Sequence, residues 1–415
     1  MNIDEHRLTW VLIGAIGLCC GTAHAGGPPE YEVTAIIEGF QCGDHLAGVA
    51  PNAVNEAGDV AGYVICAFVQ RAFRWTADTG LELIPMPPQT NESRALAING
   101  SKVVGYHVVS GNGFGHIGFL YDFETDEFTS LGTLPGGNWS DARGINSACE
   151  IVGFWGDIVK GPFPQAFIWR DGEMIDIHPD FGTVKSRALG INADGLVTGW
   201  MGDSQFNDAR AFIWDNGKVT ELPPIPGGFT SEGIAVNNLT DIAGRGLLID
   251  PRTDDLVARA LVRIDGEMVD LGTLPGFPNS FAIGINDNQT VIGFAQSTFA
   301  DAFVWKDGEL AALDDLIPSG LGLDLSTARG INQAGQIAAT AHSDDLNATV
   351  GLLLSPIGQG IPGDLDGDGH VGASDLLILL VSWGPCDDCN NCPADLDNNC
   401  VVGASDLLIL LSNWG

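Results

Sequence analysis

The chain has 415 residues, with 53 acidic and 18 basic side chains, so its formal net charge is −35. An apolar share of 45% is typical of a globular protein and argues against wholesale disorder. With only five lysines, the chain lacks the basic stripes that nucleic-acid phosphates or an anionic membrane surface would require. The charge instead indicates solubility, a salty environment or cation binding.

Residues 1–25 have the pattern of a signal peptide. Arg7 precedes an apolar run over residues 8–18, and the sequence A-H-A at 23–25 fits a cleavage site. The apolar run is too short to span a bilayer, and no other segment reaches transmembrane length. The sequence therefore predicts export, with the acidic Asp4 and Glu5 as departures from the usual pattern.

The mature protein is expected to begin near Gly26 and to be secreted or displayed on the cell surface, with the periplasm as a further option. Cys19 and Cys20 raise the alternative of a lipid-anchored form, which the bulky Leu18 disfavours. Seven cysteines remain after cleavage, and an oxidising compartment permits them to form disulfides.

Internal repetition dominates residues 26–357. A motif of the form [GA]-[IV]-N recurs at spacings of 44–49 residues and ends at Asn55, Asn99, Asn146, Asn192, Asn237, Asn286 and Asn332. Six units carry a serine six residues before the asparagine: Ser93, Ser140, Ser186, Ser231, Ser280 and Ser326. Six units carry a glycine after it: Gly62, Gly105, Gly153, Gly199, Gly244 and Gly293, with Ala339 in the last unit. A period near 46 is typical of propeller blades.

A second motif, A-F-x-W, begins at Ala72, Ala166, Ala211 and Ala302 and precedes turns such as Asp171-Gly172. Such a turn is a strong hairpin signal, and each unit reads as four short strands with no helical periodicity. Seven such units predict an all-β fold, a seven-bladed β-propeller. The first unit lacks its A-F-x-W strand, which reappears as residues 351–354, so we expect one blade to combine residues 31–37 with the end of the repeat region.

The pattern A-F-x-W-x-D-G, L-G-T-L-P-G-G and S-x-A-x-G-I-N is similar to the extracellular HAF repeat family of bacteria, over roughly residues 31–355. The histidine of that family's name is replaced here by Arg71, Gln165, Arg210 or Asp301. The resemblance implies an exported repeat protein and brings no established chemistry. The recurring aromatics, serines and asparagines could bind a ligand, but packing between blades and satisfaction of backbone groups at turns are the favoured interpretation.

After a Gly/Pro linker at 358–362, residues 363–415 carry two twelve-residue loops with calcium-ligand spacing. The first predicts oxygen ligands at positions 1, 3, 5, 7 and 12, from Asp364, Asp366, Asp368, the His370 carbonyl and Asp375. The second predicts them from Asp395, Asp397, Asn399, the Val401 carbonyl and Asp406. Cys400 replaces the usual glycine at position 6 of the second loop, where a positive φ would strain it.

Each loop leads into the same apolar stretch, V-G-A-S-D-L-L-I-L-L, which predicts a short helix at 371–380 and at 402–411. Duplicated EF-hand-like loops with one helix each resemble a type I dockerin. The resemblance implies a cohesin-like partner, and in many bacteria such modules attach enzymes of polysaccharide catabolism to a scaffold. The N-W-G ending resembles versions from bacteria without such scaffolds, so another cell-surface protein remains an alternative partner.

The cysteines suggest disulfides rather than metal ligands. Cys42 and Cys66 are expected to pair within the split blade, which leaves Cys149 over. Cys386, Cys389, Cys392 and Cys400 allow either two disulfides or a zinc site, and the exported context favours disulfides.

The sequence contains no G-x-S-x-G, H-E-x-x-H or P-loop motif, so no catalytic residue is assigned. His107, His116 and His178 could face one end of the ring, although solvated loop positions are the favoured interpretation. The favoured function is a non-catalytic binding or structural propeller whose ligand, if any, is a polysaccharide or a protein. The alternative is a carbohydrate-active hydrolase or lyase whose scattered carboxylates the sequence does not locate.

Overall fold

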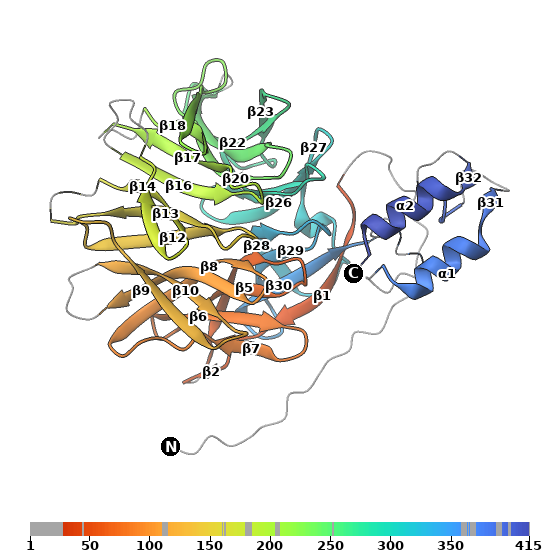
Figure 1. The fold of residues 1–415 in the computed structure, drawn as a ribbon, viewed down its shortest axis with the longest axis horizontal. Helices are drawn as coiled ribbons and strands as arrows, with labels where there is room; N and C mark the ends of the chain where they lie inside the picture. Colours follow the sequence, from red (N-terminus) through yellow and green to blue (C-terminus); the bar gives the residue numbers. More distant parts are fainter. Residues whose placement is uncertain are drawn as a thin grey trace.

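The computed structural model describes residues 28–43, 45–109, 115–159, 161, 163–178, 185–203, 208–250, 253–357, 363, 365, 371–386, 392–396 and 400–414. The predicted signal peptide at 1–25 and the linker at 358–362 lie outside these residues. Within them, seven four-stranded antiparallel sheets make up the large body in Figure 1, and a smaller C-terminal module carries two helices. In this part of the chain, no helix has the length and apolar character that a membrane span requires.

The first strand of each sheet contacts the first strand of the next, from β4 to β28 and back to β4, so the sheets are the blades of a closed propeller. From the axis outward, blade 1 consists of β4 (Gly48–Val54), β5 (Val60–Cys66), β6 (Val69–Thr76) and β7 (Gly80–Leu83). In the same order, blade 2 consists of β8 (Thr90–Asn99), β9 (Lys102–Val109), β10 (His116–Asp122) and β11 (Glu127–Gly132). Blade 3 consists of β12 (Trp139–Ile145), β13 (Ile151–Gly156), β14 (Gln165–Arg170) and β15 (Glu173–Asp176). Blade 4 consists of β16 (Lys185–Ile191), β17 (Val197–Gly202), β18 (Arg210–Asp215) and β19 (Lys218–Leu222). Blade 5 consists of β20 (Glu232–Val236), β21 (Ile242–Ile249), β22 (Leu256–Ile264) and β23 (Glu267–Gly272). Blade 6 consists of β24 (Asn279–Ile285), β25 (Val291–Gln296), β26 (Ala300–Lys306) and β27 (Glu309–Ala312). Blade 7 consists of β28 (Leu323–Ile331), β29 (Ile337–Ser343), β30 (Ala348–Pro356) and β1 (Tyr31–Ile37).

The last blade is built from both ends of the repeat region, as the sequence predicts. Strand β1 pairs antiparallel with β30, from Tyr31 opposite Pro356 to Ile37 opposite Gly351. This pairing covers the edge of β30 and joins the two ends of the ring, so opening the ring would require breaking a full strand pairing.

Hairpin turns and close backbone approaches account for the repeated Asp-Gly pairs and glycines. Asp171 and Gly172 both have positive φ, 53° and 83°, as a two-residue type I′ turn requires. The glycine of the second strand lies against a bulge in the first strand of its blade. A Cβ on Gly153, for example, would lie 1.9 Å from the carbonyl oxygen of Asp141, so a side chain there would displace the strand.

The repeated serines join neighbouring blades. Ser93 on β8 accepts a hydrogen bond of 3.0 Å from the backbone N–H of Ala72 on β6, the alanine of the A-F-x-W motif one blade earlier. The same bond recurs from Gly118, Ala166, Ala211 and Ala260 to Ser140, Ser186, Ser231 and Ser280. The two sequence motifs therefore repeat together because one satisfies the backbone of the other.

The repeated asparagines form a second series of inter-blade bonds. The side-chain nitrogen of each donates to a carbonyl of the next blade, at 2.9–3.2 Å, for Asn55, Asn146, Asn192, Asn237, Asn286 and Asn332. The bond from Asn332 reaches the carbonyl of Asn55 and crosses the closure of the ring. The phenylalanines of the A-F-x-W motif, such as Phe73, Phe167 and Phe303, are fully buried. The structural interpretation of these repeated residues is confirmed.

A short hairpin, β2 (Gln41–Cys42) and β3 (His45–Leu46), connects β1 to the first complete blade. Cys42 and Cys66 form the predicted disulfide, with their Cα atoms 5.7 Å apart. The expectation that both lie in the split blade is wrong, because Cys66 ends β5 in the following blade. The disulfide therefore fixes the segment after β1 to blade 1 next to the ring closure. Cys149 is free, as predicted.

The C-terminal module contains both predicted helices, α1 (Ala373–Val381) and α2 (Ala404–Ser412), and the short strands β31 (Gly384–Pro385) and β32 (Val401–Val402). The helices pack against each other, and repeat-related residues form the core: Val371 with Val402, and Leu379 with Leu410. In the propeller, the only helical turn among the described residues is the short 3-10 segment η1 (Leu313–Asp315).

Candidate functional site

The inner strands carry variable side chains between their repeated ones. In Ser93-Arg94-Ala95-Leu96, the serine and alanine are fully buried, whereas Arg94 and Leu96 alternate with them and face the opposite way. The residue after the repeated serine, or at its position in blade 1, is not itself repeated. It is arginine in blades 2 and 4 and different in each of the others: Ala50, Arg94, Asp141, Arg187, Glu232, Phe281 and Thr327. The seven-fold pattern is therefore broken at these positions.

Five arginines gather around the propeller axis, and we call them the axial arginines: Arg94, Arg143, Arg187, Arg245 and Arg329. The charges of Arg94 in blade 2 and Arg143 in blade 3 act on Arg329 of blade 7, which places side chains of non-adjacent blades around one common space. In a chain with only 18 basic side chains, this gathering makes the axis a cationic region inside an acidic protein.

Aromatic rings of the second strands lie against these guanidinium groups. The Arg187 carbon Cζ lies 4.5 Å from the centroid of the Phe154 ring and 5.4 Å from that of Trp200. Arg94 lies 4.8 Å from the centroid of the Tyr63 ring. These contacts stabilise the positive charges by cation–π attraction and hold the long side chains in place.

Two carboxylates balance part of this charge. Asp141 Oδ2 accepts a hydrogen bond of 2.8 Å from Arg143 Nη2, and Glu232 Oε2 accepts one of 3.0 Å from Arg245 Nε. Burial lowers the pKa of the Arg187 guanidinium, and the neighbouring charge of Arg143 lowers it further. A positive charge in such surroundings gains more from a bound anion than an arginine in water would.

A cavity of about 360 Å³ lies between blades 2, 3 and 4, at one side of the axial arginines. It is lined by Arg94, Leu96, Tyr106, His116, Trp139, Asp141, Arg143, Phe154, Ile158 and Arg187. Four buried polar atoms of this lining have no hydrogen-bond partner in the described structure: Arg143 Nε, Arg187 Nε, His116 Nδ1 and Asp141 Oδ1. Such a concentration of unsatisfied donors and acceptors around one cavity is typical of a binding site.

The positions of the histidines differ from the expectation that they occupy solvated loops. His107 and His116 lie on strands β9 and β10, not on solvated loops. His107 is 4% exposed and packs edge-on against Phe128, whereas His116 faces the cavity with its ring 4.6 Å from that of Tyr106. Burial lowers the pKa of the His116 imidazole, so the neutral form prevails near neutral pH. His178 bonds to Ser186 Oγ at 2.7 Å and does not line the cavity.

The C-terminal module holds a second candidate site, made of two matching carboxylates. Asp375 Oδ1 and Oδ2 accept backbone hydrogen bonds of 2.7 Å from Leu365 and Gly372. Asp406 repeats both bonds at 2.7 Å, from Leu396 and Gly403. Both aspartates are fully buried at the starts of their helices, where the helix dipole favours a negative charge.

The remaining proposed calcium ligands are only partly described. Asp395 is 5% exposed, and Val401 lies on β32. The other proposed ligands lie outside the described residues: Asp364, Asp366, Asp368, His370, Asp397 and Asn399. Cys400, at position 6 of the second loop, has φ of 69°, so the strained left-handed backbone expected there is present. Its N–H donates a hydrogen bond of 2.7 Å to Asp395 Oδ2, which stabilises this conformation.

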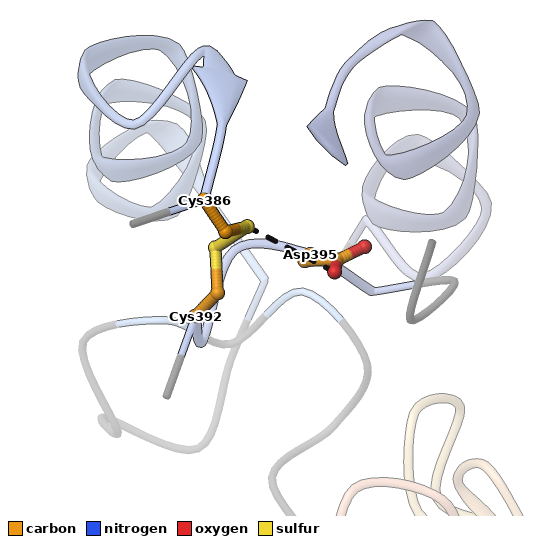
Figure 2. A group of neighbouring side chains, drawn as sticks. All are labelled: Cys386, Cys392 and Asp395. Atoms are coloured by element: carbon orange, nitrogen blue, oxygen red, sulfur yellow. Dashed lines mark hydrogen bonds between the residues drawn. A yellow bond between two sulfur atoms is a disulfide. The ribbon is translucent and has the colours of Figure 1, made fainter. Parts of the chain in front are cut away.

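The cysteines of the module do not form a zinc site with Asp395. Figure 2 shows Cys386, Cys392 and Asp395 side by side, but the two sulfurs are bonded to each other and therefore are not thiolate ligands. Cys400 is also disulfide-bonded. Cys389 lies outside the described residues.

Comparisons with known proteins identify no family for this chain. No protein-family model matches the sequence, and no curated protein matches it. The propeller domain of the trilobed protease from Pyrococcus furiosus is 13% identical, with a TM-score of 0.45, over 69% of this chain and 98% of that one. Acylaminoacyl peptidase in complex with a chloromethyl ketone is 12% identical, with a TM-score of 0.43, over 71% of this chain and 50% of that one. A prolyl endopeptidase structure is 10% identical, with a TM-score of 0.49, over 75% of this chain and 50% of that one.

The chain thus spans about half the length of those two peptidases. Sequence reasoning missed the axial arginines, because in one dimension they are scattered among seven units. The signal that could have found four of them is the pair of variable positions flanking the repeated alanine, one of which is arginine in each of blades 2, 3, 4 and 7.

Proposed function

We propose that this is an exported, calcium-binding protein. In this proposal, its non-catalytic propeller is a binding module, and its dockerin-like C-terminal domain attaches it to an extracellular scaffold or cell-surface partner. The observation that carries the proposal is the matched pair of buried carboxylates, Asp375 and Asp406, in a module with no lysine or arginine to neutralise them.

Residues 356–415 contain nine aspartates and no lysine or arginine. Burying ionised carboxylates without a compensating cation is costly, so the donor set fits a hard cation that prefers oxygen ligands. The first loop would hold Ca²⁺ through Asp364, Asp366, Asp368, the His370 carbonyl and Asp375. The second would hold it through Asp395, Asp397, Asn399, the Val401 carbonyl and Asp406. When bound, the ion supplies charge neutralisation that couples folding to its concentration.

The attachment role is supported by apolar residues that the two helices expose in equivalent places. Leu377 and Leu408 are 64% and 69% exposed, and Trp383 and Trp414 are 48% and 47% exposed. Large apolar side chains repeated at the surface of a small module favour an interface with a partner. Because the two halves present the same side chains, a partner could bind in either of two orientations.

The non-catalytic role of the propeller is supported by the state of its axial carboxylates. Asp141 and Glu232 are hydrogen-bonded to arginines at 2.8 and 3.0 Å, so guanidinium groups already engage the carboxylates that lie at the axis. A glycoside hydrolase needs one carboxylic acid that gives up a proton, together with a second carboxylate. The alternative, a hydrolase or lyase of polysaccharide catabolism, would have to place that pair elsewhere.

Two measurements test this proposal. Calcium titration of the chain, with folding of the C-terminal module followed by tryptophan fluorescence, should show a calcium-dependent transition that Asp364→Ala and Asp395→Ala weaken separately. A screen of the propeller against polysaccharides should record both retention and product release. Module folding that is unchanged by chelation would overturn the calcium role, and release of sugars would overturn the non-catalytic role.

A further inference from the structure

The cavity between blades 2, 3 and 4 combines three features that constrain its ligand. It offers guanidinium donors from Arg143 and Arg187, an acceptor from Asp141, and aromatic rings from Trp139 and Phe154. With about 360 Å³, it has the size of a small organic ligand site rather than of a bare ion site.

The arginines on one side of the cavity require an anionic ligand. Arg143 and Arg187 each have a buried Nε–H without an acceptor in the described structure. The Nη2 group of Arg143 already donates to Asp141 at 2.8 Å, so one axial carboxylate serves this arginine while Arg187 keeps an excess positive charge. Guanidinium groups bind carboxylates, and also phosphate groups, with two parallel hydrogen bonds, so the arginines fit an anionic oxygen group of this kind.

The acceptor side requires a hydroxyl group on the same ligand. Asp141 is 2% exposed, and its Oδ1 has no donor although its Oδ2 is bonded to Arg143. A buried carboxylate oxygen without a donor is costly, and a ligand O–H would satisfy it. The same carboxylate repels a ligand that brings only negative charge, such as sulfate, so an anion without a hydroxyl group is disfavoured.

The aromatic side requires a flat, partly apolar face. The ring of Trp139 lies 5.5 Å from His116 and 5.7 Å from Phe154, so several rings form one wall of the cavity. Pyranose rings present such a face of C–H groups, with their hydroxyls around the edge. A carboxylate, a hydroxyl rim and an apolar face occur together in a uronic acid.

We propose that this cavity binds a uronic acid unit of an acidic polysaccharide. The carboxylate lies between Arg143 and Arg187, a hydroxyl donates to Asp141 Oδ1, and the sugar ring packs on the aromatic wall. This inference rests on the proposed role of the propeller as a binding module and names its ligand class. A neutral sugar would leave both arginines unsatisfied, so selectivity for the acidic sugar follows from the lining.

The test is calorimetric titration of the full chain in calcium with an oligogalacturonate, and with the neutral galactose oligomer of the same length as the matched ligand. We expect the oligogalacturonate to bind at least about tenfold more tightly, since hydrogen bonds to charged groups are worth roughly 1.5–3 kcal/mol. Its affinity should fall as salt rises, because salt screens part of the attraction. Equal binding of the two sugars, or no binding of the acidic one, would overturn the inference.

Variants locate the site. Arg187→Gln should weaken oligogalacturonate binding about tenfold or more. Arg170→Gln is the matched control, because Arg170 also lies over an aromatic ring, 5.6 Å from Trp214, and pairs with Glu150 at 3.5 Å, but does not line the cavity. An Arg187→Gln variant that binds like wild type would overturn the inference. If that variant fails to fold, the acidic-to-neutral affinity ratio of the wild type decides the question.

The outcomes separate this inference from the proposed function. Retention of a neutral polysaccharide without binding of the acidic one would overturn only the uronic acid assignment. Release of cleaved sugar from a bound acidic polysaccharide would overturn the non-catalytic role and leave the ligand class standing.

Discussion

The propeller and the C-terminal module are both built by repetition, but the repeated residues occupy different places in the two. In the propeller, repeated residues such as Ser93, Phe167 and Asn237 are buried, and variation is found at the axis. In the module, the repeat extends to exposed side chains such as Leu377 and Leu408. Repeated residues that are buried are explained by their role in holding the fold together. Side chains that vary around the propeller axis, or that repeat on an exposed surface, indicate binding instead.

The two regions also differ in how charge is balanced. The axial carboxylates of the propeller are paired with arginines, as Asp141 is with Arg143. The module has buried carboxylates and no lysine or arginine, so its stability should depend on a cation that the propeller does not need.

The largest expected effect therefore separates the regions by calcium. Chelation with EGTA should unfold the module and leave the propeller transition unchanged in differential scanning calorimetry, because in the proposed function only the module depends on a cation for charge neutralisation. Asp406→Ala should reduce the calcium response of the module, whereas the exposed neighbour Ser405→Ala should not. A single transition that ignores EGTA would remove the distinction between the two regions.

The next effect concerns the ring closure. Replacing both Cys42 and Cys66 by serine removes a disulfide that spans 24 residues, and should lower the free energy of unfolding of the propeller by about 3 kcal/mol. Chemical denaturation of the propeller measures the change. Cys149→Ser is the control, because Cys149 is free and should cost little. Equal stability of the two variants would show that the covalent link adds nothing to the strand pairing of β1 with β30.

A single inter-blade asparagine should contribute somewhat less. Asn237 is 3% exposed, donates to the Asn286 carbonyl at 3.0 Å, and accepts from the Asp241 backbone at 2.8 Å. Asn237→Ala leaves these buried groups unsatisfied and should lower the free energy of unfolding by about 2 kcal/mol.

Asn99 provides the matched control for this variant. It occupies the same place in its repeat but makes no side-chain hydrogen bond to another described residue, and it is only partly buried. Asn99→Ala should therefore cost well under half as much in the same denaturation experiment. Equal losses for both variants would mean that the asparagine acts within its own turn and not between blades.

Much of the fold was predictable because its physical causes are local and periodic. The Asp-Gly turns and the serine and asparagine motifs fix the strands and their repeat, and the missing strand before residue 31 predicts the split blade. The pairing of β1 with β30 confirms that prediction. The position of Cys66 was misassigned, because repeat units defined by sequence motifs start at a different strand from the blades defined by pairing.

The cavity between blades 2, 3 and 4 could not be predicted in the same way. Its residues come from three blades, and Arg94 and Arg187 line one cavity only because the ring curves around an axis. His116 illustrates the same limit. Between glycine-rich segments it reads as a loop residue, but in the structure it starts a strand and packs against Tyr106. Curvature and strand boundaries depend on long-range packing, which a single sequence shows poorly.

The smallest expected effect tests whether bound protons neutralise part of the carboxylate charge of the propeller. Asp301 on β26 is partly buried near Asp314, Asp324 and Asp315; burial first, and then these charges, raise its pKa to about 6. The native state therefore binds this proton more tightly than the unfolded state, where the pKa is about 3.9. The resulting stability is present below about pH 4 and is lost as pH rises to about 6.

Asp301→Asn should remove this loss and stabilise the propeller at pH 7 by about 1 kcal/mol or less, because solvent screens a group that is only partly buried. Asp307→Asn, at an exposed hairpin turn of the same blade, should leave the pH profile unchanged. Thermal denaturation between pH 4 and pH 7 measures both variants. If the propeller transition shifts with calcium instead of pH, and Asp301→Asn abolishes that shift, the acidic cluster of the propeller is itself a cation site, and the division between a proton-sensitive ring and a calcium-dependent module fails.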